Sequence, residues 1–289
     1  MSRDFVIFTD TSADLPEQYI RDNQLGLLSL SFTIGGETYL CSDMKMTERE
    51  FYAKMRAGEA VTTIQVNPDQ AEQKFEQVLR EDKDILYLAF SSALSGSCNS
   101  GAMAARELQQ RYPQAKIIVV DTLCASLGEG LLVHKAVQMK QQGLTLEEIA
   151  RWAEANKLHV CHRFTVDDLN HLHRGGRVSK TTAVVGTLLG IKPVLHVSNE
   201  GKLVPTGKVR GRKQSLISLV DSMAKTMGSY ENDTVFISHG DCVEDANFVA
   251  DLIRERLKVR NFLIHFVDPT IGAHSGPGTV ALFFMGEER

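Results

Sequence analysis

Clusters of small polar residues directly follow several apolar, strand-like runs of this chain, and this pattern constrains the fold most. The clusters lie at residues 10–14, 91–97, 121–122 and 272–278. In open parallel α/β sheets, ligands bind at the carboxyl ends of the strands. Hydroxyl groups, glycines and one histidine at those ends predict a pocket for a polar group such as a carboxylate, a phosphate or a sugar.

The order of the segments predicts two domains. Strand-like and helix-like segments alternate along residues 5–156, which indicates a mostly parallel sheet flanked by helices in Rossmann-like layers. Beyond residue 157, a hairpin signal at residues 198–201 and further strands favour a mixed-sheet α+β unit. We therefore expect an N-terminal α/β domain at residues 1–160, a C-terminal α+β domain at residues 161–289, and a ligand between them.

Composition argues against several classes of protein. The net charge of -4 gives no general attraction to nucleic acid or to anionic membranes. The five cysteines form no CxxC pair, which predicts reduced thiols and a cytoplasmic protein. The sequence shows no signal peptide and no apolar stretch long enough to span a bilayer. We expect no nucleic acid partner and at most transient contact with a membrane surface.

The common nucleotide, metal and hydrolase motifs do not occur. The sequence contains neither a P-loop nor a GxGxxG fingerprint, and HExxH is missing. The histidine-containing segments at residues 159–162 and 171–173 have no third ligand at metal spacing. No GxSxG nucleophile elbow surrounds a serine. The chain is therefore predicted to bind neither a metal nor a cofactor.

Residues 91–97 form the strongest single candidate for a ligand site. They follow a strand-like run and precede a predicted helix, and hydroxyl and N–H groups at a helix N-terminus bind anions. One serine there would be an ordinary N-cap. Four serines in seven residues, with Gly96 permitting close approach of the backbone, favour a ligand site.

Residues 272–278 contain three glycines, Pro277 and His274. They predict a loop between two strands whose free N–H groups hold an anion. A tight connecting loop, with the histidine bonded to the backbone, is an equally good interpretation.

Two further polar segments carry weaker signals. Residues 62–65 predict, by themselves, only a capping segment before a helix. Asp10 and Asp14 predict caps of the first helix, and a metal site is the less favoured interpretation.

Taken in order, these motifs resemble the DegV family, fatty-acid-binding proteins that include the FakB subunits of bacterial fatty acid kinase. The resemblance covers essentially the whole chain. It rests on residues 10–15, 63–68, 91–97, 121–130, 168–177, 192–193, 201–203, 208 and 272–278.

The resemblance implies one long-chain fatty acid, such as palmitate, stearate or oleate, in a buried tunnel between the domains. In the family, a Thr, a Ser and a His hold the carboxylate; by motif position these are Thr63, Ser95 and His274, and we include Gly96 and Ser275 in the predicted site. Neutral donors position a carboxylate without the desolvation cost of a buried ion pair. Apolar candidates for the tunnel wall, most of them equally consistent with ordinary core, are residues 27, 28, 30, 32, 183–185, 188–189 and 262–266.

The resemblance further implies a separate ATP-binding kinase subunit that converts the bound carboxylate to an acyl-phosphate for phospholipid synthesis. The present chain would be the non-catalytic carrier and would need no cofactor. Arg174, Arg177 and Lys208 are our candidates for a patch that docks the kinase or stabilises the phosphate. A solvated basic face is the simpler alternative.

Two other functions remain open. One is a serine-type hydrolase that uses Ser95 with His274, and the missing nucleophile elbow and third triad member argue against it. The other is a polar-metabolite-binding protein with the same Ser/His site, whose ligand would need no long apolar tunnel.

Overall fold

Three β-sheets organise the computed structural model, which describes residues 3–43, 45–179 and 190–289. The first sheet is parallel throughout, with the order β2-β1-β6-β7. Its strands are β1 (Phe5–Asp10), β2 (Gly26–Leu28), β6 (Asp84–Ala89) and β7 (Ile117–Asp121). Every residue of β6 is buried, as expected for a central strand covered on both faces.

Helices cover both faces of this parallel sheet, as the alternating pattern predicted. On one face, α3 (Pro68–Leu79) and α4 (Ser97–Arg111) share a hydrophobic core with the sheet. On the other face lie α5 (Leu127–Gln141) and α6 (Leu146–Asn156). The short helix α1 (Glu17–Asp22) follows β1.

The second large sheet is mixed and uses the later part of the chain, which agrees with the predicted fold class. Its order is β10-β9-β8-β13-β11-β12, and only the β11–β12 pair is parallel. The strands are β8 (Val160–Thr165), β9 (Ile191–Val197), β10 (Leu203–Arg210), β11 (Thr234–His239), β12 (Asn261–Phe266) and β13 (Val280–Met285). The predicted hairpin at residues 198–201 joins β9 to β10.

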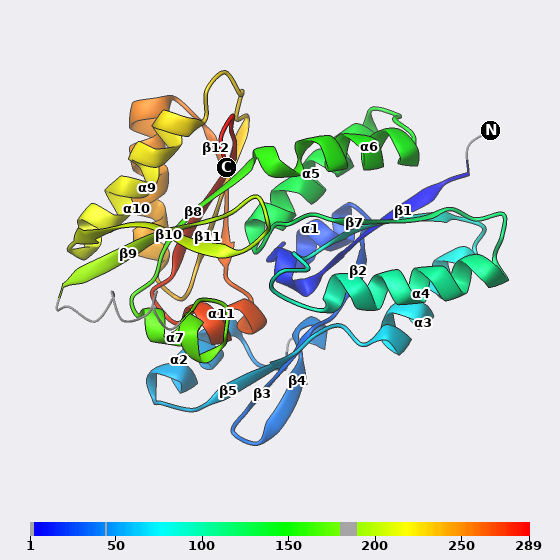
Figure 1. The fold of residues 1–289 in the computed structure, drawn as a ribbon, viewed down its shortest axis with the longest axis horizontal. Coiled ribbons are helices and arrows are strands. Elements are labelled where there is room, and N and C mark those ends of the chain that lie inside the picture. The colour runs from blue at the N-terminus through cyan, green and yellow to red at the C-terminus, as the bar shows by residue number, and fades with distance from the viewer. Residues whose placement is uncertain (1–2, 44, 180–189) are drawn as a thin grey trace.

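Helix α5 joins the two large sheets into one structure. It packs against β1 and β6 of the parallel sheet and against β8, β11 and β13 of the mixed sheet. Helices α9 (Arg212–Thr226) and α10 (Val243–Leu257) cover the other face of the mixed sheet (Figure 1). The last strand of the parallel sheet ends at Asp121 and the first strand of the mixed sheet begins at Val160, and the domain boundary near residue 160 stays a prediction.

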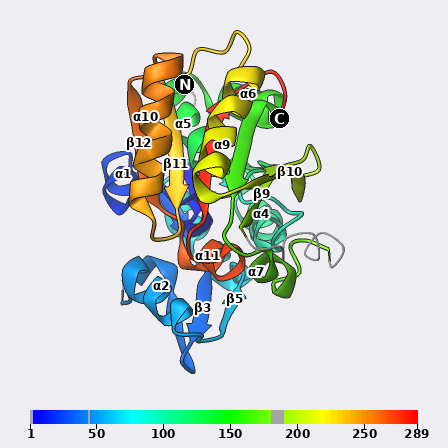
Figure 2. The ribbon, with the colours of Figure 1, turned by 90° about the vertical axis from the view of Figure 1, so that its left-hand side faces the viewer.

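A small antiparallel sheet, β4-β3-β5, lies with α2 (Glu48–Arg56) at one end of the molecule, next to α11 (Figure 2). Its strands are β3 (Ser31–Ile34), β4 (Glu37–Leu40) and β5 (Val61–Ile64). Residues 26–34 are divided between two sheets, because β2 pairs with β1 whereas β3 pairs with β4 and β5. The predicted capping segment at residues 62–65 instead lies mostly in β5, whose partner β3 comes from an earlier part of the chain.

A segment predicted to be a loop forms a short helix. Residues 272–278 were expected to be an N–H-rich loop, but most of them belong to α11 (Pro269–Ser275). The Asp268 side chain accepts a hydrogen bond from Thr270 N at 2.7 Å, and Pro269 occupies the first turn. These start signals outweigh the glycines. Likewise, α7 (Leu169–Arg174) begins at an Asp168 cap.

The predicted tunnel residues 183–185 and 188–189 lie outside the described residues. Of the helices in the described part of the chain, none combines the length and the apolar character needed to cross a bilayer.

Candidate ligand-binding site

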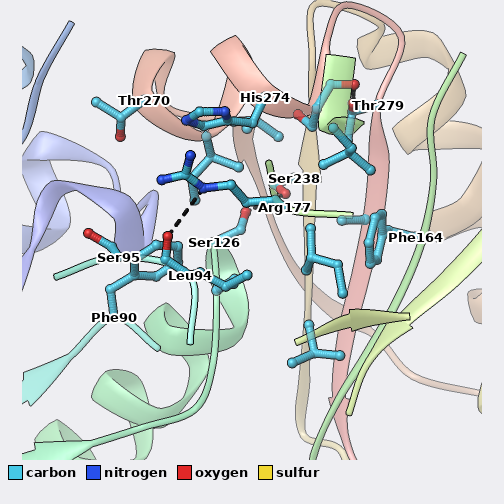
Figure 3. A pocket seen from close by; sticks show the side chains of 18 of the residues that line it. Phe90, Leu94, Ser95, Ser126, Phe164, Arg177, Ser238, Thr270, His274 and Thr279 are labelled. Atoms are coloured by element: carbon cyan, nitrogen blue, oxygen red, sulfur yellow. Dashed lines mark hydrogen bonds between the residues drawn. The ribbon is translucent and has the colours of Figure 1, made fainter. Parts of the chain in front are cut away.

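A cavity lies where the parallel sheet, the mixed sheet and α11 meet (Figure 3). Its volume is about 180 Å³, whereas one buried water molecule needs roughly 10–15 Å³. Much of its wall is apolar and comes from both halves of the chain. The apolar lining includes Phe90, Leu94, Ala125, Phe164, Val197, Leu203, Ile271, Ala281 and Phe283.

Thr63 and His274 meet at this cavity although 211 positions separate them. Thr63 lies in β5, where pairing with Phe32 of β3 fixes its position. His274 lies in the last turn of α11, which packs against β5. Thr63 Oγ1 and His274 Nε2 are 2.9 Å apart, a hydrogen bond.

Ser95 reaches the same cavity from the turn between β6 and α4. Its Oγ accepts a hydrogen bond from Ser97 N at 3.2 Å and lies 3.0 Å from Ser97 Oγ. Ser97 Oγ in turn accepts from Val66 N at 3.1 Å. The buried Ser97 hydroxyl therefore ties the turn to the segment after β5, a positioning role that sequence reasoning did not assign.

Gly96 supports this arrangement by lacking a side chain. A Cβ atom at Gly96 would collide with the amide of Gln65, which itself lines the cavity. The other serines of the motif have different environments: Ser91 Oγ donates to the Gly201 carbonyl at 2.9 Å, and Ser92 is exposed. Of the four serines, only Ser95 lines the cavity.

The imidazole of His274 is held in its neutral form. Burial, assisted by the nearby Arg177 guanidinium, lowers the pKa of His274 to about 4. A Cβ atom at Gly175 would collide with Nδ1 of the ring, so the glycine allows the end of α7 to pack directly on the histidine. At neutral pH the ring therefore offers one N–H donor and one acceptor.

Arg177 adds a cation to a site that we predicted from neutral donors alone. Its Nε donates to the Leu94 carbonyl at 3.2 Å, its Nη1 donates to the Gly175 carbonyl, and the side chain lines the cavity. Figure 3 shows the guanidinium between Leu94 and His274. Since both acceptors are uncharged, an anion in the cavity would be the first negative partner of Arg177 among its described contacts.

The other two members of the predicted basic patch have different environments. Arg174 is exposed, and its Nη2 lies 3.0 Å from His171 Nδ1. Lys208 is exposed on β10, the edge strand of the mixed sheet. Arg177 thus belongs to the cavity, whereas Arg174 and Lys208 belong to the surface.

Ser275 follows His274 on α11 and also lines the cavity. It is 5% exposed, and its Oγ is buried without a hydrogen-bond partner in the described structure. Such a group costs about 1–3 kcal/mol unless something in the cavity bonds to it. Ser275 therefore lies where a polar part of a ligand, or a water molecule, would bind.

Behind the cavity lies a group of buried carboxyl groups. Asp10 accepts hydrogen bonds from Ser12 N, Tyr87 Oη and Phe90 N, so it caps the short 3-10 turn after β1. We expected Asp10 and Asp14 to cap the first helix, but α1 begins after Pro16 without a side-chain cap. Glu129, which sequence reasoning missed, is fully buried and accepts a hydrogen bond from a threonine of β1. Burial raises the pKa of both acids. Across residues 3–43, 45–179 and 190–289, no three His, Cys, Asp or Glu side chains are grouped to hold a metal ion.

A family model described as an uncharacterised protein of the DegV family matches residues 4–287. A DegV domain-containing protein of Clostridium perfringens is 46% identical over 286 residues, covering 99% of this chain and 98% of the relative. One of Lactococcus lactis subsp. lactis is 36% identical over 285 residues and covers 98% of each.

Solved structures of the same fold carry a functional description. A Thermus thermophilus structure described as fatty acid binding of a DegV family protein superposes with a TM-score of 0.86 at 28% identity, covering 98% of this chain and 99% of that one. A fatty acid binding DegV family protein from Streptococcus agalactiae superposes with a TM-score of 0.87 at 28% identity, covering 99% and 100%.

Proposed function

This chain belongs to the DegV family, and on that premise we propose that it binds one long-chain fatty acid in the cavity of Figure 3. The carboxyl group lies at Thr63, Ser95 and His274, which we call the head site. The single observation that carries the proposal is the convergence of these three side chains, from β5, the β6–α4 turn and α11, on one largely apolar cavity.

The energetics favour a ligand with a long apolar tail. Burial of a methylene group contributes roughly 0.8 kcal/mol, so ~14 methylenes supply about 11 kcal/mol before entropic costs. The head site then only has to orient the carboxyl group, for which two hydroxyls, a neutral imidazole and the nearby Arg177 suffice. The relatives from Thermus thermophilus and Streptococcus agalactiae are described as fatty acid binding, which supports the same ligand class here.

The structure gives less support to the two alternatives. Ser95 Oγ is bonded to Ser97, and His274 Nε2 is bonded to Thr63, so the two residues of the hydrolase hypothesis have other partners. A polar metabolite would bring its polar groups against the aromatic and aliphatic walls of the cavity, where they would lack hydrogen-bond partners.

The protein presents this carboxyl group to a separate ATP-dependent kinase subunit, which forms the acyl-phosphate for phospholipid synthesis. In this proposal the chain is a non-catalytic carrier in the cytoplasm, where its five free cysteines stay reduced. In this proposal Arg177, which lines the cavity, stabilises the added phosphate, and the exposed Arg174 and Lys208 contact the kinase.

The ligand is tested by mass spectrometry of an organic extract of the purified protein, followed by titration of the delipidated protein with palmitate. We expect one fatty acid per chain. Ser95→Ala should weaken binding about tenfold, since one hydrogen bond to a charged group contributes about 1.5 kcal/mol. Ser92→Ala, an exposed serine of the same turn, is the matched control. A clean extract from protein that takes up no palmitate would contradict the proposal.

The carrier role is tested separately with the ATP-binding subunit. Arg174→Glu should slow acyl-phosphate formation while palmitate affinity stays the same. Lys74→Glu, an exposed lysine on α3, is the control for the change in net charge. Equal rates for both variants would remove Arg174 from the docking surface.

A further inference from the structure

The cavity contains a second group of hydroxyls, Ser126, Ser238 and Ser275, which we call the inner wall. In the view of Figure 3, Ser126 and Ser238 lie between Ser95 of the head site and the apolar side chain of Phe164. A saturated hydrocarbon chain makes no use of hydroxyls there. A hydroxyl of the inner wall can bind a ligand group only if its own partners leave it a free donor or acceptor.

Backbone contacts of one segment link the elements that carry Ser238 and Ser275. Ser238 pairs with Ala281 where β11 meets β13. Two residues earlier, Thr279 Oγ1 donates to the Ser275 carbonyl at 3.1 Å. The start of β13 thus connects the end of β11 with the end of α11, and both serines are among the residues that line the cavity.

Ser275 is the first hydroxyl with spare capacity. Its Oγ is buried and has no partner among the described residues, and Ser275 is one of the residues that line the cavity. The neighbouring Thr279 hydroxyl, by contrast, is bonded to the Ser275 and Gly276 carbonyls. A methylene group placed against Ser275 would leave the hydroxyl unsatisfied, whereas a hydroxyl on the ligand would bond to it.

Ser238 is the second, and its capacity depends on a chain of hydrogen bonds. Ser238 Oγ lies 2.8 Å from Ser126 Oγ, and Ser126 Oγ is bonded to Asp14 Oδ2. Asp14 Oδ1 already accepts from Asp268 N at 3.0 Å. When Asp14 is protonated, its proton lies on Oδ2 and points to Ser126, Ser126 donates to Ser238, and the Ser238 O–H is left to donate into the cavity.

Asp14 is set up to keep that proton. It is 4% exposed, and burial raises its pKa well above the usual range. The carboxyl groups of Asp268 and Glu48 add to the rise, while the hydrogen bonds from Ser126 and Asp268 N oppose it. The inner wall therefore offers one donor, at Ser238, and one unpaired hydroxyl, at Ser275.

We propose that Ser238 and Ser275 form a subsite for a hydroxyl group on the acyl chain, so that monohydroxylated long-chain fatty acids bind more tightly than the unsubstituted acids. The ligand hydroxyl accepts from Ser238 Oγ and donates to Ser275 Oγ. This inference rests on the proposed function, because it needs a fatty acid whose carboxyl group lies at the head site.

The test is competition on the delipidated full-length protein between octadecanoic acid and a panel of monohydroxyoctadecanoic acids, with the hydroxyl stepped along the chain. At one position, or at two neighbouring positions, we expect affinity about 3- to 10-fold above that of octadecanoic acid, the value of one net hydrogen bond. Ser238→Ala and Ser275→Ala should each bring that ratio down to one or below. Ser92→Ala should keep the ratio.

Two results would contradict the proposed hydroxyl subsite. In the first, no hydroxylated isomer binds more tightly than octadecanoic acid, which would mean that water alone uses these hydroxyls. In the second, a preference exists but persists in both alanine variants. Failure of the proposed function is a different result, because octadecanoic acid itself would then not bind.

Discussion

The head site and the inner wall are both built from hydroxyls, but they differ in what lies behind them. At the head site, Thr63 bonds to the neutral His274 and Ser95 bonds to Ser97. Behind the inner wall lies the buried carboxyl group of Asp14, whose backbone carbonyl also accepts from His265 Nδ1 at 3.0 Å. Uncharged partners leave the head site available for a ligand, whereas the inner wall is also part of the framework.

Substitutions behind the inner wall should therefore change stability, and substitutions at the head site should change ligand affinity. Asp14 connects the turn after β1 with Ser126 before α5 and with the loop that leads into α11. Loss of its side chain therefore acts on stability. Loss of a head-site hydroxyl acts mainly on ligand affinity, because the strands that carry it remain paired.

The largest expected effect is that of Asp14→Ala. The substitution leaves Ser126 Oγ and Asp268 N without their buried partner, at about 1–3 kcal/mol each, so the free energy of unfolding should fall by about 2–6 kcal/mol. Asp14→Asn mimics the protonated acid and should cost less than half as much. Urea unfolding of the three proteins at neutral pH measures both values. Equal losses for Ala and Asn would show that Asp14 acts as a charged group.

The next largest effect belongs to the head site. Thr63→Val keeps the shape of the side chain and removes the hydroxyl that bonds to His274. We expect palmitate affinity to fall about 5- to 30-fold, because one hydrogen bond to a carboxylate contributes about 1–2 kcal/mol. The free energy of unfolding should change by less than ~1 kcal/mol. Titration calorimetry measures the palmitate affinity, and urea unfolding of the same sample measures the free energy of unfolding. A loss of stability without a loss of affinity would contradict the assignment of Thr63 to the head site.

Gly175 provides a test through packing alone. Gly175→Ala places a Cβ atom against His274 Nδ1, so the imidazole has to move away from Thr63. We expect palmitate affinity to fall about tenfold, the value of roughly 1.4 kcal/mol. Gly207→Ala is the control, because a Cβ atom there meets nothing within 4 Å. Unchanged affinity in Gly175→Ala would mean that the position of His274 does not matter for the ligand.

The stability of the protein should also depend on pH through His274 and Asp268. The pKa of His274 is lowered to about 4 in the folded protein, so the unfolded chain binds the proton more readily, and stability falls as the pH drops from about 6.5 towards 4. Asp268 behaves in the opposite way, because burial raises its pKa to about 6 and stability falls as the pH rises from about 4 to 6. Urea unfolding at several pH values should show a shallower loss on acidification for His274→Gln and a shallower loss on the way up to pH 6 for Asp268→Asn. Unchanged slopes would contradict the assigned pKa values.

Sequence alone predicted the large elements well, because continuous apolar runs and amphipathic spacing depend on local signals. The alternating segments of residues 5–156 include every strand of the parallel sheet and the helices α3, α4, α5 and α6 that cover it. Strand β5 was missed because its four residues become a strand only through pairing with β3. Helix α11 was missed because its glycines favoured a loop, although Asp268 and Pro269 before it are signals for the start of a helix.

The candidate site shows the same division. Thr63, Ser95 and His274 were named from motif order, and the structure brings them to one cavity. Glu129 carries no local signal of burial, since an acid in the first turn of a helix is usually exposed and favourable there. Likewise, Arg177 stood among other basic residues in the sequence, and only the packing of α7 against α11 separates it from the surface.

The most direct test of the head site is the carboxyl resonance of palmitate labelled with ¹³C at its first carbon, bound to the delipidated protein. We predict one resonance that does not titrate between pH 5 and pH 8 as the resonance of the free acid does, and that shifts in Ser95→Ala but not in Ser92→Ala. A bound resonance whose chemical shift titrates with pH as that of the free acid does, and is the same in both variants, would place the carboxyl group outside the head site and contradict the account.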